Sequence, residues 1–347
     1  MGLFASKNEF PVDGRTVLIT GGSKGLGLNA AFQLTEKGAN VIIVARDIGN
    51  LRNAMTEISK RARDGGGQRF HLISADVTTA AECQRVVGEA TEWNGKPPDI
   101  VWCCSGSAHP TLFVDTPLDQ FQSMMDSNYF SSVYMAHAIL NAWFASATAG
   151  TDESQQAASS QQGRTGAVRP PARHIVFTGS FVSFYSFAGF TPYSPSKAAV
   201  RSLSDSLSQE MNLYAAAYPD LPPVRVHTVF PATMPTQSLE DENAVKTDLT
   251  KSLEEGDQIL QPEECARRAI RGLESGEELV PTSTIIRLVM TSVMGGSIRG
   301  GFWKGLANTL LGAITLFVMI FIRWDMDIKV QRWGKLHGAT GSHQKKK

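Results

Sequence analysis

The sequence has few of the residues that build metal sites and disulfide frameworks. Its 347 residues include four cysteines, Cys83, Cys103, Cys104 and Cys265, and none belongs to a C-x-x-C pair or to a Cys/His spacing typical of zinc. We therefore expect no metal, and we expect buried free thiols in a reducing compartment. The first residues, MGLFASKNEF, lack an apolar run of signal-peptide length.

An excess of either charge is also missing. The 33 Lys and Arg residues balance the 33 Asp and Glu residues, so the formal net charge is zero. Without a basic stripe interleaved with aromatics, we expect no nucleic-acid partner. The hydrophobic fraction of 42% is ordinary for a globular protein and allows a sizeable core.

Short apolar runs alternate with helical patterns from residue 15 onward. Most runs are rich in Val and Ile and nearly continuous, which is typical of strands buried on both faces of a parallel sheet. Their alternation with helices predicts a Rossmann-type α/β fold, a doubly wound parallel sheet of about seven strands. The predicted strands lie at 15–20, 40–45, 69–75, 99–104, 173–179, 224–230 and, more weakly, 278–282.

The C-terminal region contains a long stretch without charge. Residues 305–322 carry no charged side chain over 18 positions, with Trp303 and Lys304 before them and Arg323 and Trp324 after them. About 20 apolar residues cross the hydrocarbon core of a bilayer, and Trp with Lys or Arg is typical of its interfaces. We predict a hydrophobic membrane anchor, spanning or re-entrant; a buried soluble helix is the alternative.

Changes in composition divide the chain. Residues 148–172 are almost entirely small, polar, Gly or Pro, which predicts a disordered insertion because little apolar area is available to offset the entropy of ordering. Residues 284–294 could lie on a membrane surface. The predicted parts are an N-terminal segment (1–11), the α/β domain (12–282) with its insertion (148–172), a membrane-associated or transmembrane segment (283–325) and a basic tail (326–347).

A glycine-rich turn follows the first predicted strand. It leads from Thr20 through Gly27 directly into a helical pattern. Glycines let the backbone approach a pyrophosphate, and the helix N-terminus offers free N–H groups, so this context predicts a dinucleotide site. The candidate residues are Gly21, Ser23, Lys24, Gly25, Leu26 and Gly27.

The end of the second predicted strand indicates which nucleotide binds. It reads Val44-Ala45-Arg46, with no acidic residue at its end to accept from a ribose 2′-OH. Arg46 offers a fork of donors suited to a 2′-phosphate, and Lys24 adds a second positive charge, so we predict NADPH. A solvated surface arginine is the alternative. Asp76 and Val77 are placed to meet the adenine, although Asp76 also suits a helix cap.

Three residues after the fifth predicted strand form a candidate catalytic group. Ser180 follows that strand directly, and Tyr193 and Lys197 lie four positions apart in a helical pattern. That spacing places the ammonium near the phenol and favours the phenolate, which suits general acid catalysis. Alone, each of these features is common by chance.

The order of these motifs resembles the short-chain dehydrogenase/reductase family over about residues 12–282. The resemblance implies an oxidoreductase in which Tyr193 donates the proton to a carbonyl oxygen, Lys197 lowers the pKa of Tyr193 and holds the nicotinamide ribose, and Ser180 hydrogen-bonds the carbonyl. It also implies that Asn128 supports a water-linked proton path. The alternative for Asn128 is a helix asparagine that bonds neighbouring backbone.

The sequence departs from the family pattern in two places. Cys103-Cys104-Ser105-Gly106 stands where the family often has Asn-Asn-Ala-Gly, so only Gly106 is kept for the cofactor. Pro231-Ala232 replaces the common Pro-Gly after the sixth strand. The resemblance still implies that Thr233 and Thr236 touch the carboxamide or the phosphates of the cofactor. Ser183 is a weaker alternative to Ser180.

The overall layout is similar to the 3-ketodihydrosphingosine reductases of this superfamily. That resemblance implies reduction of 3-ketosphinganine to sphinganine at the endoplasmic reticulum membrane, with the catalytic domain facing the cytosol. It also implies a membrane-resident long-chain ketone and membrane lipid as partners, and the family makes a homodimer or homotetramer plausible. A steroid or retinoid reductase is the alternative substrate class, and an inactive nucleotide-binding scaffold at the membrane is a distant one.

Overall fold

A single parallel sheet organises the computed structural model, which describes residues 8–65, 67–149, 171–293, 301–338 and 341–342. Its strand order is β3-β2-β1-β4-β5-β6-β7. This confirms the predicted doubly wound α/β fold, and every strand lies within one residue of its predicted bounds. The strands are β1 (Thr16–Thr20), β2 (Asn40–Ala45), β3 (Phe70–Ser74), β4 (Ile100–Cys103), β5 (Arg173–Thr178), β6 (Val224–Phe230) and β7 (Leu279–Pro281).

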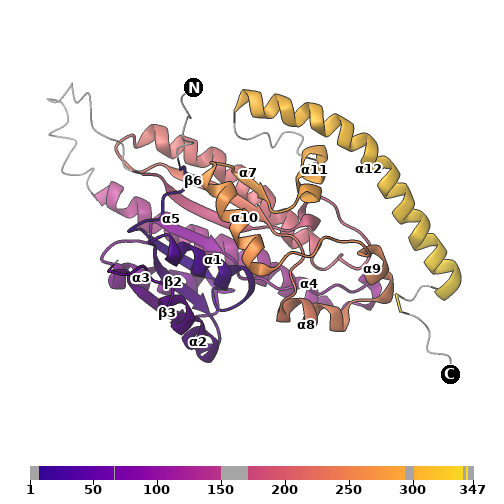
Figure 1. Ribbon diagram of the computed structural model, residues 1–347, viewed down its shortest axis with the longest axis horizontal. Helices are drawn as coiled ribbons and strands as arrows, with labels where there is room; N and C mark the ends of the chain where they lie inside the picture. The colour runs from indigo at the N-terminus through magenta and orange to yellow at the C-terminus, as the bar shows by residue number, and fades with distance from the viewer. Residues whose placement is uncertain (1–7, 66, 150–170, 294–300, 339–340, 343–347) are drawn as a thin grey trace.

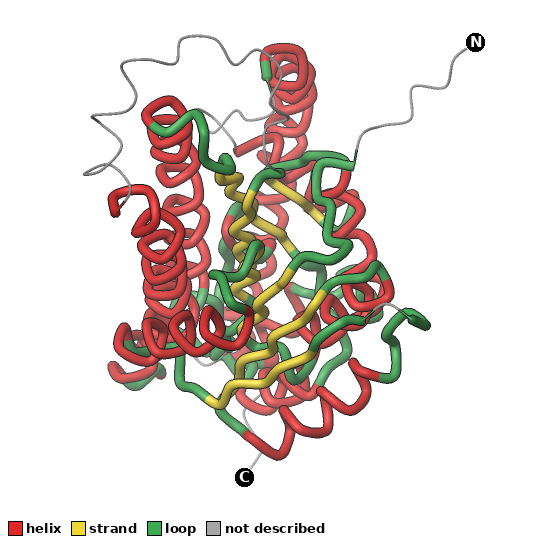
Figure 2. The backbone as a smooth tube through the Cα atoms, turned by 90° about the vertical axis from the view of Figure 1, so that its left-hand side faces the viewer, coloured by secondary structure: helices red, strands yellow, loops and turns green. Residues whose placement is uncertain are grey.

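Helices cover both faces of the sheet (Figures 1 and 2). Successive side chains of a strand point to opposite faces of the sheet, and each face is buried in a hydrophobic core. Strands buried on both faces therefore need nearly continuous apolar runs. One core packs against α3 (Ala80–Asn94), α5 (Ser131–Ala149) and α7 (Ser194–Ala217). The other packs against α1 (Gly25–Glu36), α2 (Ile48–Ser59) and α10 (Pro262–Glu274).

Shorter elements lie between these layers. The chain after β4 forms a 3₁₀ turn, η1 (Phe113–Asp115), then α4 (Leu118–Met124) and a π-helix, η2 (Met125–Phe130), which runs into α5. After β5 comes a 3₁₀ turn, η4 (Phe181–Ser183), and after β6 come α8 (Gln237–Val245) and α9 (Asp248–Leu253). The predicted insertion at 148–172 falls almost entirely outside the described residues.

The predicted membrane segment consists of two helices with different surroundings. One face of α11 (Thr284–Val293) is buried, and Ile286 and Met290 belong to a core cluster with Phe230. The expected membrane-surface position at 284–294 therefore applies only to its exposed face, because the other face completes the domain core. Ile285 and Leu288 lie on the exposed face.

The second of these helices, α12 (Phe302–His337), runs along the outside of the domain (Figure 1). Among the described residues it is the one helix long and apolar enough to cross a membrane. Its most apolar 18-residue window is only 17% buried, which separates it from a buried core helix. The helix continues past residue 325, through the first part of the predicted basic tail, without a break.

Contacts attach α12 to the domain at several points. A side chain at Gly312 would collide with the backbone oxygen of Thr291, so the α11 and α12 backbones lie close together. Further along, the Tyr185 hydroxyl donates to the sulfur of Met326 over 3.2 Å. The helix therefore lies against the chain that follows η4.

Candidate functional site

A cavity of about 990 Å³ opens at the carboxyl ends of the strands. The cavity lies beside the boundary between β1 and β4, where the strand order changes direction: β2 and β3 follow on one side and β5 to β7 on the other. Ligands of open α/β sheets usually bind at this point. Every site residue predicted from the sequence lines the cavity except Ser183, the weaker alternative to Ser180. These are Gly21, Ser23, Lys24, Gly25, Leu26, Gly27, Arg46, Asp76, Val77, Gly106, Asn128, Ser180, Tyr193, Lys197, Pro231 and Thr233.

The glycine-rich turn is a close-packed cradle. Gly21 has a positive φ of 65°, and a Cβ added there would lie 2.9 Å from the Cys104 carbonyl carbon and the Ser105 nitrogen. A Cβ at Gly27 would lie 2.5 Å from the Gly21 oxygen. Larger residues would displace the turn from β4, so glycine is needed at both positions. Lys24, just before α1, makes no side-chain cap bond, which leaves the helix N-terminus open to an anion.

Charged groups after β2 and β3 form the outer part of the cavity. Arg46 is exposed and lines it. The neighbouring Asp47 is engaged as the cap of α2, where its carboxylate accepts from the Asn50 backbone over 2.6 Å. Asp76 accepts from the Thr78 backbone over 3.1 Å, while Thr79 caps α3. Asp76 thus closes a local turn rather than capping the helix.

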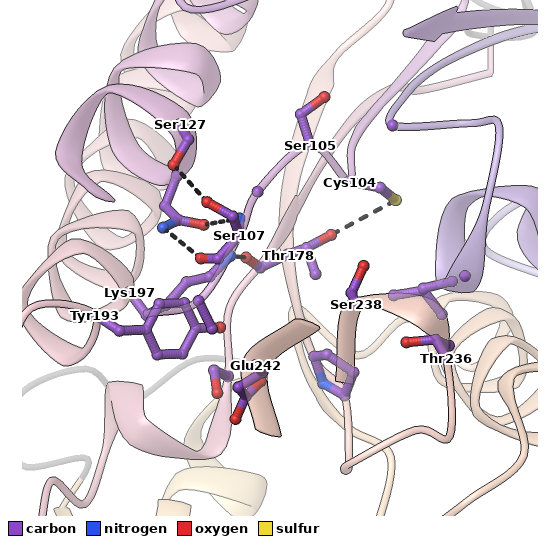
Figure 3. Close-up of a pocket in the computed structure, with 18 of the residues that line it drawn as sticks. Cys104, Ser105, Ser107, Ser127, Thr178, Tyr193, Lys197, Thr236, Ser238 and Glu242 are labelled. Atoms are coloured by element: carbon purple, nitrogen blue, oxygen red, sulfur yellow. Dashed lines mark hydrogen bonds between the residues drawn. The ribbon is translucent and has the colours of Figure 1, made fainter. Parts of the chain in front are cut away.

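Tyr193 and Lys197 stand where β5 meets α7. Tyr193 directly precedes the first turn of α7, and Lys197 lies one turn further, with its ammonium nitrogen 5.8 Å from the Tyr193 ring centroid. That nitrogen donates to the Thr178 carbonyl over 2.9 Å. The carbonyl at the end of β5 therefore orients the buried lysine side chain toward the cavity (Figure 3).

Burial controls the ionisation of both groups. Desolvation raises the pKa of the Tyr193 phenol well above its ordinary value. A hydrogen bond with Ser180 lowers this pKa, and the charge of Glu242 raises it further. Desolvation also lowers the pKa of Lys197 to about 8, with a smaller opposing effect from Cys104. The protein chain alone therefore does not produce the lowered Tyr193 pKa that the family resemblance implied.

The two candidate serines have different environments. Ser180 lines the cavity and interacts with the Tyr193 hydroxyl. Ser183 is buried, accepts from the Ser180 backbone over 3.1 Å and donates to the Lys197 carbonyl over 3.0 Å. Its hydroxyl is thus occupied in joining η4 to α7. The geometry favours Ser180 as the group that meets a ligand.

Asn128 links its own helix to the Ser107 backbone beside the cavity. It lies in the π-helix η2, a type of helix often found at functional sites, and is 1% exposed. Its amide accepts from the Ser107 backbone over 3.1 Å and donates to the Ser107 and Met124 carbonyls, each over 3.0 Å. A Cβ at Gly106 would collide with this amide, which explains why glycine stands there.

Sequence reasoning missed the wall of the cavity that faces Tyr193. Aromatic and apolar side chains line it, together with three carboxylates from the chain that follows β6. No motif identifies this wall; the one available signal is its position, because chain that leaves the carboxyl end of a strand crosses the mouth of the site. The missed residues are Phe187, Phe190, Met234, Leu239, Glu242, Glu254 and Asp257.

The family profile described as short chain dehydrogenase matches residues 15–151 and 167–247, which carry the turn, the serine and the Tyr/Lys pair. The chain belongs to the short-chain dehydrogenase family. It is accordingly an oxidoreductase of ketone and CH–OH groups, and a nicotinamide nucleotide is its cofactor. The observed residues suit that nucleotide: the cradle at Gly21 and Gly27 accepts a pyrophosphate, and Lys197 extends toward the nicotinamide end.

Named relatives in this family cover nearly the whole chain. The 3-ketodihydrosphingosine reductase ksrA of Aspergillus fumigatus is 42% identical over 97% of this chain and 89% of the relative. The 3-ketodihydrosphingosine reductase gsl-3 of Neurospora crassa is 40% identical over 100% of this chain and 90% of the relative.

Solved structures show the same fold. A short-chain dehydrogenase/reductase from Mycobacterium marinum is 22% identical, has a TM-score of 0.60, and is matched over 79% of this chain and 96% of its own. The crystal structure of gox2181 is 20% identical, with a TM-score of 0.61, over 80% of this chain and 98% of its own.

Proposed function

We propose that this enzyme reduces 3-ketosphinganine to sphinganine with NADPH in sphingolipid biosynthesis. The observation that carries the proposal is the position of Tyr193, Ser180 and Lys197 in a cavity whose opposite wall carries aromatic and apolar side chains beside three carboxylates. Tyr185, two residues before Phe187 of this wall, contacts α12. Relatives at 40 and 42% identity bear the name of that reductase over nearly the full chain. A long-chain ketone requires both an acid at the carbonyl and an apolar path for its chain.

The preference for NADPH rests on charge at the outer end of the cavity. Arg46 and Lys24 both line it. Asp47, the nearest carboxylate in sequence, caps the N-terminus of α2, where one of its oxygens accepts from the Asn50 backbone. A guanidinium beside an ammonium favours a phosphate at that position.

The chain's own residues supply binding, orientation and the proton. When bound, the nicotinamide supplies the hydride. Tyr193 donates its phenolic proton to the substrate oxygen, and Ser180 hydrogen-bonds that oxygen and the phenol. Lys197, held by the Thr178 carbonyl, binds the ribose and stabilises the phenolate that remains. Asn128 fixes the backbone at Ser107 and supports the path by which the proton is replaced.

The C-terminal helix accounts for access to a lipid substrate. Tyr185, two residues before the cavity-lining Phe187, bonds to Met326, so α12 lies against the chain that leads into the cavity wall. An apolar helix with Trp303 and Trp324 at the two ends of its uncharged stretch suits a bilayer interface. We place the enzyme at the endoplasmic reticulum membrane with its catalytic domain in the cytosol, as a homodimer or homotetramer through α7.

The decisive experiment compares substrates. Purified protein in lipid vesicles should oxidise NADPH with 3-ketosphinganine and yield sphinganine, with steroid and retinoid ketones turned over far more slowly. Turnover of only the latter ketones would contradict the substrate assignment. NADPH binding without turnover of any ketone would instead indicate a nucleotide-binding scaffold.

A further inference from the structure

The cavity wall that faces Tyr193 carries an excess of negative charge. Glu242 of α8, Glu254 and Asp257 all line the cavity, whereas one ammonium, that of Lys246, lies among them. The Glu242 and Glu254 side chains are 18% and 20% exposed. Partly buried carboxylates are costly to desolvate unless a cation meets them, so this wall favours a cationic ligand group.

Lys246 neutralises only part of this negative charge. Its side chain is 2% exposed, and its nitrogen lies 2.8 Å from Glu242 Oε1 and 2.5 Å from Glu254 Oε2. The same nitrogen stands 5.7 Å from the Phe190 ring centroid, and Lys246 itself does not line the cavity. Within the described ranges, no residue bonds to Glu242 Oε2, so that oxygen remains an acceptor at the cavity.

Glu242 is also near the reacting centre. The Phe190 ring centroid lies 5.7 Å from the Lys246 nitrogen and 6.1 Å from the Tyr193 ring centroid, so one aromatic ring separates the ion pair from the catalytic phenol. Figure 3 shows Glu242 on the side of the pocket toward which the Tyr193 hydroxyl points. Its charge reaches the phenol, since it raises the pKa of Tyr193.

Resting on the proposed function, we propose that Glu242 selects the substrate by binding the ammonium group of a long-chain 2-amino ketone. In such a ketone the carbon that bears the amine is bonded directly to the carbonyl carbon. A substrate whose carbonyl oxygen meets Tyr193 therefore brings its ammonium to the wall that carries Glu242. An amine next to a carbonyl titrates near about 7.7–8.0, as a chain-terminal α-amino group does, so it is mostly protonated at pH 7.

The ion pair has a second consequence for the acid. While no ligand ammonium is bound, Glu242 disfavours the phenolate of Tyr193 by like-charge repulsion. A substrate ammonium placed beside Glu242 offsets that repulsion and makes Tyr193 a stronger proton donor while the ketone is bound. Ketones without the amine, including steroids, retinoids and N-acylated analogues, lack both effects.

The test pairs two substrates with two variants. The substrates are 3-ketosphinganine and the 1-hydroxy-3-ketone of equal chain length without the amine; the variants are Glu242→Gln and the control Asp241→Asn. Asp241 is exposed on the same helix, does not line the cavity, and accepts from Gln237 over 3.2 Å. Glu242→Gln should lower kcat/KM for the amino ketone about 10- to 100-fold, as expected for loss of a charge-assisted bond. The amine-free ketone should be reduced no more slowly than by wild type, because it makes no bond to Glu242 and the repulsion of the phenolate is also removed.

The outcomes separate this inference from the proposed function. Asp241→Asn should match the wild type on both ketones, and Glu242→Asp should recover part of the preference for the amine. Equal losses on both ketones in Glu242→Gln would mean that Glu242 only holds Lys246 in place, and would overturn the inference. If wild type reduces both ketones equally well, the inference fails while the proposed function stands. If wild type reduces neither, the proposed function itself fails.

Discussion

The two walls of the cavity are built in different ways. The cofactor wall (residues 21–27, 45–47, 76–78 and 104–107) consists of short turns that directly follow β1, β2, β3 and β4. The substrate wall (residues 187–190 and 233–257) consists of longer connections with short helices, of which α9 packs against α12. Backbone geometry shapes the first wall and side-chain chemistry the second, so the first suits a constant ligand and the second a particular substrate.

The largest effect should come from the acid that stands between the two walls. Tyr193→Phe should lower kcat for ketone reduction about 10²- to 10⁴-fold, because it removes the proton donor. The affinity for NADPH, measured by nucleotide fluorescence, should stay close to wild type because the cofactor wall is intact. Unchanged ketone reduction in this variant would show that another group is the acid.

A change confined to the cofactor wall should affect nucleotide choice. Arg46→Ala should raise the KM for NADPH about 10- to 100-fold, through loss of charge-assisted bonds to the 2′-phosphate, and change the KM for NADH little. Arg52→Ala, an exposed α2 residue that does not line the cavity, is the matched control. Equal effects of Arg46→Ala on both nucleotides would exclude the phosphate role.

The pH dependence of activity and of stability should follow the ionisation of Lys197, the buried lysine between the two walls. With a pKa of about 8, Lys197 carries its charge below that pH, so kcat/KM should fall about tenfold per pH unit above it. The contribution of Lys197 to stability should change in the opposite direction. At this residue the unfolded chain binds more protons than the folded one between about pH 8 and 10.4, so its contribution to the free energy of unfolding should rise with pH. The buried thiols and the Tyr193 phenol, whose pKa values burial raises, contribute with the opposite sign.

The control for this pH prediction is Lys197→Met. The difference in the free energy of unfolding between wild type and this variant, measured with denaturant across the same pH range, should shift in favour of wild type as pH rises. The thiols and the phenol titrate in both proteins, whereas the buried amine titrates in wild type alone. A difference that shifts toward the variant from pH 8 to 10.4 would show that the lysine is stabilised in its charged form.

Of these changes, removal of α12 should have the smallest effect on the catalytic step itself. Deletion of residues 301–347 should release the protein from membranes in a salt-wash sedimentation assay and leave NADPH affinity unchanged. The KM for long-chain ketones should rise, because the Tyr185 to Met326 contact is lost, whereas small soluble ketones should be reduced as before. The truncation keeps α11, whose Ile286 and Met290 are part of the core. Continued association with membranes would show that another surface binds them.

The cofactor wall could be predicted from the sequence because its determinants are local. Each turn joins a strand to a helix over a few residues, so the glycines at 21, 25 and 27 and the arginine at 46 fall in place once the strands are identified. Asn128 and Gly106 also reach the predicted site. The collision that a side chain at Gly106 would cause with Asn128 appears only in the fold, because the two residues come from different connections.

The substrate wall could not be predicted in the same way. Glu242 lies on the chain after β6, in a stretch that reads as an ordinary charged surface helix. Only the fold places it at the cavity, paired with the buried Lys246. The membrane segment shows the same limit. Its apolar character is evident in the sequence, yet the division between α11 in the core and α12 outside depends on how the two helices pack.

The sequence by itself determined the strand–helix alternation, the glycine turn, the order of Ser180, Tyr193 and Lys197, and the presence of one long apolar helix. These features follow from residue types a few positions apart, where local sterics and periodicity decide. Only the tertiary structure decided that burial raises the pKa of Tyr193, that Ser180 rather than Ser183 lines the cavity, and that Glu242 stands near the phenol. Desolvation and charge act through space, between groups that the chain separates by tens of residues.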